Sequence, residues 1–303
     1  MASRIGTGAV SVFNFAGNLE AVPLALIGSS YAVAAFPALS EASTANKRDE
    51  FMRILSASAR HIILWSIVAL GLIVVLRAHL VRVILGTGAF DWDATRLTAA
   101  LLAILTAGLI AQGLALLFSR ALYAVRQSWR PLFYQLAGGA LTVLLATVLL
   151  SMPASGLPAS LAAFLRVGDV PGTTVLLLAL SATLGQIFLA ILSLIALRSV
   201  TPGLARSLVR PFLDGCVAAL AGGAAAYMML AFEGGIAPLT TLVAVFTQGF
   251  VAGMVGLVAS AAALYVVENE EFRIVTNALE KLVHMRGYRS DALEPAAEEP
   301  LQP

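Results

Sequence analysis

The sequence predicts an all-α, polytopic membrane protein with seven transmembrane helices. Hydrophobic residues fill 59% of its 303 positions and charged residues only 12%, whereas charged residues form about a quarter of an average soluble domain. Seven apolar runs each approach or exceed the roughly 20 residues that a helix needs to cross a bilayer. Lysine and arginine gather in alternate connections between these runs, as the topology of a multi-spanning protein requires.

The predicted spans cover residues 9–38, 60–77, 95–119, 131–151, 173–197, 209–231 and 239–266. Between the fourth and the fifth, the apolar stretch Leu157–Leu165 is too short to span, which predicts an external loop with an interfacial helix. Residues 47–60 mix charges with apolar residues at helical spacing. They are expected to form either a helix on the cytoplasmic membrane surface or a solvated extension of the second span.

The distribution of basic residues predicts the orientation of the chain. Fourteen of the 19 lysines and arginines flank one side of the predicted spans, and five flank the other, namely Arg4, Arg77, Arg82, Arg96 and Arg166. Because cytoplasmic connections carry the excess of positive charge, we expect the C-terminus in the cytoplasm and residue 1 outside.

Three parts are predicted along the chain. Residues 1–200 form a bundle of five transmembrane helices, residues 201–267 add two more, and residues 268–303 hold a cytoplasmic amphipathic helix (268–286) and an acidic, disordered tail. Small residues recur at four-residue spacing in the sixth and seventh spans, as Gly215, Ala219 and Gly223, then Gly249 and Gly253. This spacing predicts that the two helices pack as a pair or form a groove for lipid.

Composition and motifs argue against an enzyme. The two Gly-x-Gly triplets, at residues 6–8 and 86–88, lack the continuation of a phosphate-binding loop. No serine, cysteine or histidine lies in a nucleophile motif. Cys216 is the single cysteine and the three histidines are far apart in sequence, so no metal, cofactor or nucleic acid is expected. Asp214 lies near the cytoplasmic rim, where we expect it to cap or pair locally.

The first span carries the candidate site. Asn14, Asn18, Glu20 and Pro23 lie near its middle, where hydrocarbon tolerates polar groups only against protein or a water-filled cavity. Asn14 and Asn18 project from about the same face, and Pro23 is expected to bend the helix. Glu20 is either a neutral carboxyl bonded to a neighbouring helix, or a group that contacts substrate or carries protons. It would reach the asparagine face only with help from the bend.

Three ordered motifs resemble one known family. The run Gly8–Gly28, GAVSVFNFAGNLEAVPLALIG, together with FPALS at residues 36–40, closely resembles the eighth membrane helix of the lipid II flippase family MurJ, also called MviN. ILGTGAF at residues 84–90 is similar to the family pattern after the ninth helix. SRALYA at residues 119–124, followed by Pro131, is similar to the pattern that closes the tenth.

The resemblance implies a partial MOP or MATE-like flippase fold, in which two six-helix bundles enclose a cavity and two added helices form a lipid groove. This chain would supply about helices eight to fourteen, with part of the second bundle in residues 1–200. The implied activity is translocation of an undecaprenyl-pyrophosphate-linked peptidoglycan precursor from the inner to the outer leaflet of the bacterial cytoplasmic membrane by alternating access. The implied partners are that lipid-linked substrate, membrane lipids and a missing N-terminal half, from the same gene or a separate subunit.

One departure from the family concerns charge. The family's Ala-Asp-Arg is Ala16-Gly17-Asn18 here, so the cation expected to meet a pyrophosphate is absent at Asn18. Asn14, Asn18, Glu20 and Pro23 remain the candidate cavity-lining, substrate-binding residues. Arg120, Arg126 and Arg130 are candidate contacts for anionic head groups at the cytoplasmic side, although such residues often only set topology.

Two alternatives stay open. A flippase of the same superfamily for another polyprenyl-linked polysaccharide, of the O-antigen type, would share the fold. A non-transporting membrane scaffold would instead use the cytoplasmic segment after residue 268 to bind proteins of cell-wall synthesis.

Overall fold

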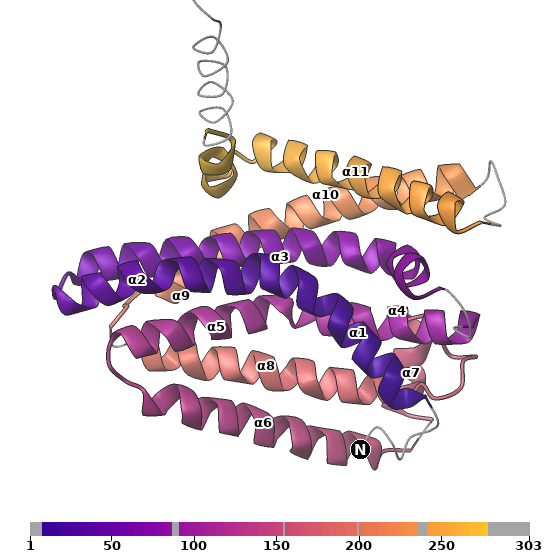
Figure 1. Ribbon diagram of the computed structural model, residues 1–303, viewed down its shortest axis with the longest axis horizontal. Helices are drawn as coiled ribbons and strands as arrows, with labels where there is room; N and C mark the ends of the chain where they lie inside the picture. Colours follow the sequence, from indigo (N-terminus) through magenta and orange to yellow (C-terminus); the bar gives the residue numbers. More distant parts are fainter. Residues whose placement is uncertain (1–7, 87–90, 154, 199, 235–240, 278–303) are drawn as a thin grey trace, which may run out of the picture.

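The computed structural model describes residues 8–86, 91–153, 155–198, 200–234 and 241–277, which form a bundle of helices (Figure 1). In chain order they are α1 (Ala9–Pro23), η2 (Leu24–Ser29), α2 (Ser30–Thr44), α3 (Arg48–Leu85), α4 (Trp92–Ala107), α5 (Leu109–Ala124), α6 (Trp129–Leu150), α7 (Leu157–Phe164), α8 (Val175–Leu197), α9 (Leu204–Ser207), α10 (Val209–Gly234) and α11 (Leu242–Val266). Residues 270–277 form a further short helix.

The described residues contain the seven predicted spans. Six helical stretches are long and apolar enough to cross a membrane, namely Ala9–Thr44, Arg48–Leu85, Trp129–Leu150, Val175–Leu197, Leu204–Phe232 and Leu242–Val266. The seventh is the pair α4 and α5, which is bent by 42°. The predicted positions of the spans are therefore confirmed, and their number is seven when the bent pair is counted as one span. The bend within the third span was not predicted.

Residues 48–60 belong to α3, which runs without interruption from Arg48 to Leu85. The apolar residues Phe51 and Leu55 are buried in a cluster with residues of α2 and α5. Because this apolar face is used inside the bundle, it is not available to lie on a membrane surface. Of the two interpretations of this segment, the extension of the second span is correct and the separate surface helix is wrong.

The third span breaks at Gly108. The amide of Gly108 bonds to the carbonyl of Leu105 at 2.7 Å and not to that of Ile104, which would be its acceptor in an α-helix. The next helix begins at Leu109. Within hydrocarbon a freed carbonyl must find a partner in the protein. Thr183 of α8 provides it, since its hydroxyl donates to the carbonyl of Ile104 at 3.0 Å.

The first span changes register after Pro23, as the proline predicted. Pro23 ends α1, and the six residues of η2 are wound as a π-helix before α2 resumes α-helical geometry. Proline lacks the N–H that would continue the ladder, and single π turns of this kind are frequent at functional sites. Gly28 of η2 crosses Gly113 of α5 so closely that a Cβ on Gly28 would lie 2.8 Å from the Cα of Gly113.

The helices α10 and α11 do pack against each other, as predicted, but through other small residues. Gly215 and Ala219 face α3, where a Cβ on Gly71 would lie 2.8 Å from the Cβ of Ala219. The direct contact of α10 with α11 involves Gly222 and Gly256. The four-residue stripes were therefore assigned to the wrong neighbour, because a stripe indicates close approach without identifying the helix that approaches.

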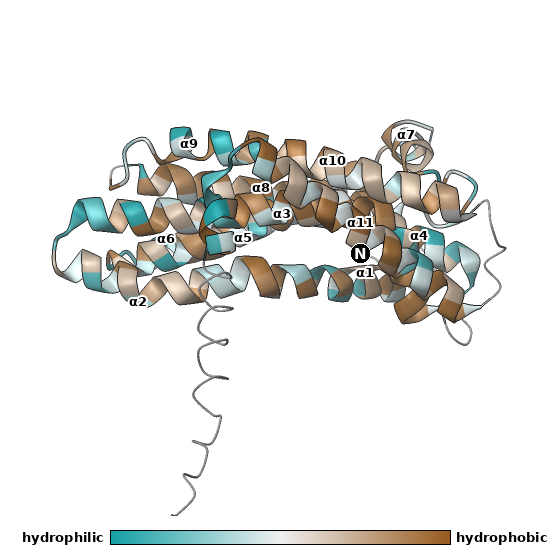
Figure 2. Ribbon diagram, turned by 90° about the horizontal axis from the view of Figure 1, so that it is seen from above, coloured by the Kyte–Doolittle hydropathy of each residue, from teal (hydrophilic) through white to brown (hydrophobic). Residues whose placement is uncertain are grey.

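The long helix α3 lies at the centre of the arrangement and contacts α2, α4, α5, α10 and α11. Seen from above, α1 and α2 run along one side of the bundle and α7, α9 and α10 along the other (Figure 2). The short helix α7 confirms that the segment after α6 is helical without spanning. The predicted helix over residues 268–286 is present over residues 270–277, whereas residues 268 and 269 are not helical; residues 278–303 lie outside the described residues.

We expect Gly71→Val to lower the stability of the fold. The added side chain would meet the Cβ, carbonyl oxygen and Cα of Ala219 at 2.8 to 3.0 Å, and overpacking of this kind costs about 1–3 kcal/mol. Gly139→Val on α6 is the matched control, because nothing lies within 4 Å of a Cβ at Gly139. Thermal unfolding in detergent should show a lower midpoint for the first variant alone, and equal midpoints would contradict the packing of α10 on α3.

Candidate functional site

The polar residues of α1 divide between two opposite faces of the helix. Asn14 and Asn18 are both exposed, on the face that also carries the exposed side chains Val22 and Leu26. Glu20 is only 7% exposed and faces the interior. Two residues advance an α-helix by about 200°, which puts Asn18 and Glu20 nearly opposite each other. The structure brings the two asparagines together and places Glu20 elsewhere.

Glu20 is bonded to a neighbouring helix. The side-chain amide of Gln112 on α5 donates to Oε1 of Glu20 at 2.5 Å. Gln112 lies one turn after Gly108, so this bond crosses from the proline-containing first span to the broken third span. The arrangement matches the simpler of the two interpretations of Glu20, that of a buried carboxyl held by another helix. A residue 92 positions away in the sequence could not be named as its partner from the pattern alone.

Pro23 contributes through backbone geometry. It is half-buried at the junction of α1 and η2, and the π-helical turn that follows shifts the register of the exposed face. The exposed face continues through this turn at Leu26, with 70% exposure, and on into α2 at Val33, with 50%. The result is a long open face with two amides near one end and apolar side chains along the rest.

The three candidate head-group arginines cluster around the connection from α5 to α6. Arg126 and Arg130 are exposed, and Arg126 occupies a left-handed turn with φ of 60°. Arg120 instead lies over the ring of Phe36 on α2, with its guanidinium carbon 6.0 Å from the ring centroid. Two of the three are therefore open to solvent or head groups, while Arg120 also ties α5 to α2.

An apolar groove lies on the opposite side of the bundle from the asparagine face. It has a volume of about 790 Å³ and is lined by α3, α4, α7, α8 and α10. None of its lining residues is charged, and the hydroxyl of Thr183 is already bonded to the backbone of α4. The sequence pointed to a groove between the sixth and seventh spans, whereas this one runs along α10 without α11. We call it the α10 groove.

An ion pair fastens the loop that carries α7. Arg96 of α4 donates to both carboxylate oxygens of Asp169 at 2.6 and 2.7 Å, and to the backbone carbonyl of Arg166 at 2.6 Å. These bonds hold the pKa of Asp169 below its usual range. Asp169 therefore stays ionised down to pH values below those at which an unpaired aspartate takes up a proton. We call this set of bonds the Arg96–Asp169 latch.

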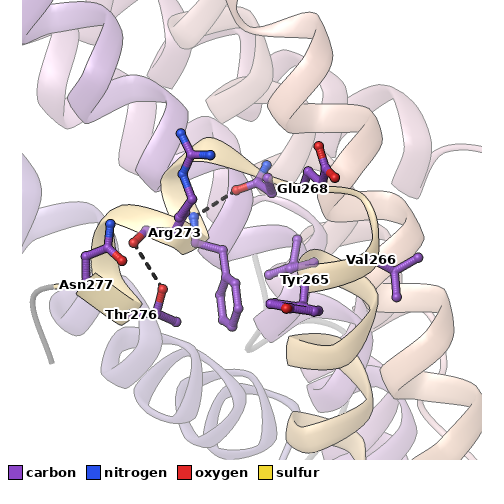
Figure 3. Close-up of a pocket in the computed structure, with 9 residues that line it drawn as sticks. Tyr265, Val266, Glu268, Arg273, Thr276 and Asn277 are labelled. Atoms are coloured by element: carbon purple, nitrogen blue, oxygen red, sulfur yellow. Dashed lines mark hydrogen bonds between the residues drawn. The ribbon is translucent and has the colours of Figure 1, made fainter. Parts of the chain in front are cut away.

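The segment after α11 folds back onto the bundle beside a second cavity (Figure 3). Asn269 donates to Asp214 of α10 at 2.8 Å and accepts from the amide of Phe272 at 2.9 Å. Glu271 pairs with Arg60 of α3 at 3.3 Å. Asp214 also pairs with Arg210, one turn earlier on α10, at 3.9 Å, which confirms the local pairing predicted for it. The cavity itself, lined by Tyr265 and residues of the 270–277 helix, lies apart from the asparagine face and the α10 groove.

Irregular membrane helices that adjoin polar side chains are typical of the binding sites of transporters, and two of the described spans of this bundle are irregular. Residues 1–247 match the family model described as Lipid II flippase MurJ, and the chain belongs to this family. It is therefore a member of a transporter family, and a multi-pass protein of the bacterial inner membrane.

Among solved structures, the chain is similar to one described as "Lipid II flippase MurJ, inward closed conformation", with a TM-score of 0.63 and 17% sequence identity. The match covers 87% of this chain and 49% of that chain, so this protein spans about half of its structural relative. The flippase fold expected from the sequence is confirmed by this likeness. A search of curated proteins gave no match.

Replacing Glu20 by alanine should destabilise the protein without touching the open face of α1. The change leaves the half-buried amide of Gln112 without its acceptor. An unsatisfied buried polar group costs about 1–3 kcal/mol, and we expect the lower end of this range because Gln112 is only partly buried. Asn18→Ala is the control on the same helix, because Asn18 is exposed. Thermal unfolding in detergent should separate the two variants, and an unchanged midpoint for Glu20→Ala would show that the bond contributes nothing.

Proposed function

We propose that this chain is the C-terminal portion of a lipid II flippase, which moves an undecaprenyl-pyrophosphate-linked peptidoglycan precursor from the inner to the outer leaflet by alternating access. The observation that supports this most is the family match over residues 1–247, within which the open face of α1 carries the two asparagines. The N-terminus is outside and the C-terminus cytoplasmic, in accord with the excess of lysine and arginine on the side of the C-terminus.

The proposed function requires an N-terminal half as a partner. Alternating access needs two lobes that close around one site, and this chain covers 49% of its structural relative. The open face of α1, η2 and α2 is the surface that such a lobe would oppose. Its apolar side chains, among them Val22 at 58% and Leu26 at 70% exposure, would line the interface or cavity.

The asparagines bind the pyrophosphate as neutral donors in this proposal. An amide can donate hydrogen bonds to a phosphate oxygen, but it lacks the charge and the paired geometry of an arginine. Most of the counter-charge must then come from the other half. Arg126 and Arg130 gather anionic head groups before entry, since each basic residue near a charged leaflet contributes about 1 kcal/mol.

Co-expression of the intact chain with the N-terminal seven helices of a MurJ protein should rescue a cell depleted of its lipid II flippase, whereas either half alone should fail. The reason is that only the pair encloses a site. Growth and lysis after depletion are the readout, and immunoblots of the membrane fraction verify that both halves are inserted.

Failure of intact, inserted halves to rescue would contradict the split-flippase proposal. Rescue of an O-antigen export defect instead would favour the polysaccharide flippase. Deletion of residues 278–303 tests the scaffold alternative and leaves the docked 270–277 helix in place. Rescue should survive this deletion, and a loss of rescue together with a loss of bound cell-wall proteins would favour the scaffold.

The double variant Asn14→Ala, Asn18→Ala should reduce transport by about tenfold or more while the unfolding midpoint stays unchanged. Hydrogen bonds to a charged group contribute about 1.5–3 kcal/mol, and both amides lie on the exposed face. Val143→Ala on α6 is the control, because Val143 is 56% exposed and lies outside the open face of α1, η2 and α2, and it should retain transport. Asn18→Arg in the Asn14→Ala background should transport at least as fast as the unaltered protein, because it supplies a cation for the pyrophosphate. Transport at the unaltered rate by the double alanine variant would show that the asparagines are not part of the site.

A further inference from the structure

Three arginines gather at the end of the bundle that carries α7. Arg77 lies on α3, eight residues before the helix ends, Arg96 lies in the first turns of α4, and Arg166 follows α7. All three belong to the five basic residues on the side of the spans that is poor in lysine and arginine. Because the excess of positive charge on the other side sets the orientation, topology gives no reason for a cluster of cations here.

The carboxylates near the start of α4 are engaged locally. Asp91 caps α4, where its side chain accepts from a backbone amide of the first turn at 2.7 Å. Asp169 is held by Arg96 in the latch, and Asp93 adds a favourable charge interaction with the same arginine. Among the residues that the structure describes, the other two arginines of the cluster take part in no ion pair.

The side chain of Arg77 folds back onto the preceding turn of its helix. Its Nη1 donates to the carbonyl of Val74 at 2.6 Å. A long basic side chain near the end of a membrane helix normally extends toward water. Arg77 is instead half-buried, and Val74 lines the α10 groove. Its charge is therefore held beside an apolar groove, where a cation needs a partner.

Arg166 places a second cation beside Arg77. The two guanidinium groups are close enough for their like charges to repel each other. The backbone of Arg166 is fixed, because it takes a left-handed φ of 59° in the turn that ends α7 and its carbonyl accepts from Arg96 at 2.6 Å. Leu165, next to it, is buried and lines the α10 groove. The fold thus holds two like charges together, which is unfavourable until an anion joins them.

We infer that Arg77 and Arg166 form a binding site for a phosphate-bearing anion, at the end of the α10 groove next to α7. Guanidinium groups bind phosphate oxygens through paired, charge-assisted hydrogen bonds, and two of them match the negative charge of a phosphate group. The anion is a free phosphate ion or the phosphate of a lipid head group, which share this chemistry. We call this pair the Arg77–Arg166 site. It does not depend on the proposed flippase function.

The Arg96–Asp169 latch keeps the site positive. Asp169 is three residues from Arg166 and is the nearest carboxylate to it in sequence. Both oxygens of Asp169 are bound by Arg96, at 2.6 and 2.7 Å, so this carboxylate is not available to neutralise Arg166. Arg96 is therefore a positioning residue, which acts on the anion through Asp169 and the backbone of Arg166.

Pyrophosphate is the first probe of the site. The full chain in an uncharged detergent is titrated with sodium pyrophosphate, or with sodium chloride at matched ionic strength, and the thermal unfolding midpoint is recorded. Pyrophosphate should raise the midpoint to a plateau, because a ligand of the folded state stabilises it. Arg77→Gln with Arg166→Gln should weaken the apparent affinity tenfold or more. Arg82→Gln is the matched control and should keep the rise, because Arg82 lies about 140° around α3 from Arg77.

Phosphatidylglycerol is the second probe, compared with a diacylglycerol of the same chains, which lacks phosphate. Native mass spectrometry measures how much of each lipid the detergent-solubilised chain retains. Binding of phosphatidylglycerol alone through the two arginines identifies a lipid head group as the ligand, and binding of pyrophosphate alone identifies a free anion. If both bind, displacement of the lipid by pyrophosphate shows that they share the site.

Two results would overturn the site: the absence of binding for both probes, or binding that persists in the double glutamine variant. Loss of folding is a separate outcome with its own readout. Without ligand and at low salt, the double variant should unfold at the same midpoint as the unaltered chain or above it, because the change removes a repulsion.

The role of the latch is tested with the same titration. Arg96→Gln should weaken the binding of pyrophosphate severalfold, because it frees the carboxylate of Asp169 to neutralise Arg166. Adding Asp169→Asn to Arg96→Gln should restore the binding, since the competing negative charge is then gone. Equal affinity in Arg96→Gln and in the unaltered chain, or no recovery in the double variant, would show that the latch does not act on the site through charge.

Discussion

Hydrocarbon offers no hydrogen bonds, so each irregularity in a membrane helix has to be completed by another part of the chain. This protein has two irregular spans, one after Pro23 and one at Gly108, and they face each other. Gln112 bonds to Glu20 across the two spans, Gly28 crosses Gly113 in close contact, and Thr183 takes up a carbonyl next to the break. These contacts join the first, third and fifth spans close to the two irregularities. They also determine which side of α1 faces the bundle and which side is exposed.

Because Glu20 is used in this junction, the open face of α1 holds only uncharged polar groups. A helix has one inward and one outward side, and the carboxyl of Glu20, which bonds to Gln112 on the inward side, is about 200° around the helix from Asn18. The first span therefore presents amides and apolar side chains where its family places an acid and a base. A pyrophosphate at this face would need cations from a partner, which makes the proposed second half a chemical requirement as well as a geometric one.

The sequence was sufficient for features that depend on neighbouring residues. Apolar runs marked the spans, the proline at position 23 marked the register change, and the short run at Leu157 marked a helix that does not span. Partners distant in the sequence could not be read in the same way. Gln112 is 92 residues from Glu20 and Asp169 is 73 residues from Arg96, and nothing in either local pattern selects the other. The stripe of small residues at Gly215, Ala219 and Gly223 of α10 indicated close packing correctly, yet it faces α3 and not α11, because a stripe does not identify the helix that approaches.

The α10 groove and the asparagine face lie on opposite sides of the bundle, and the end that carries α7 connects them. Ala9, Val12 and Ala16 of α1 belong to the same buried cluster as Ala162 and Leu165 of the α7 segment. A close-packed core transmits displacement rather than absorbing it. A shift of α7 would therefore be felt at the start of α1, two turns from Asn18. The latch at Arg96 restrains this connection from the α4 side.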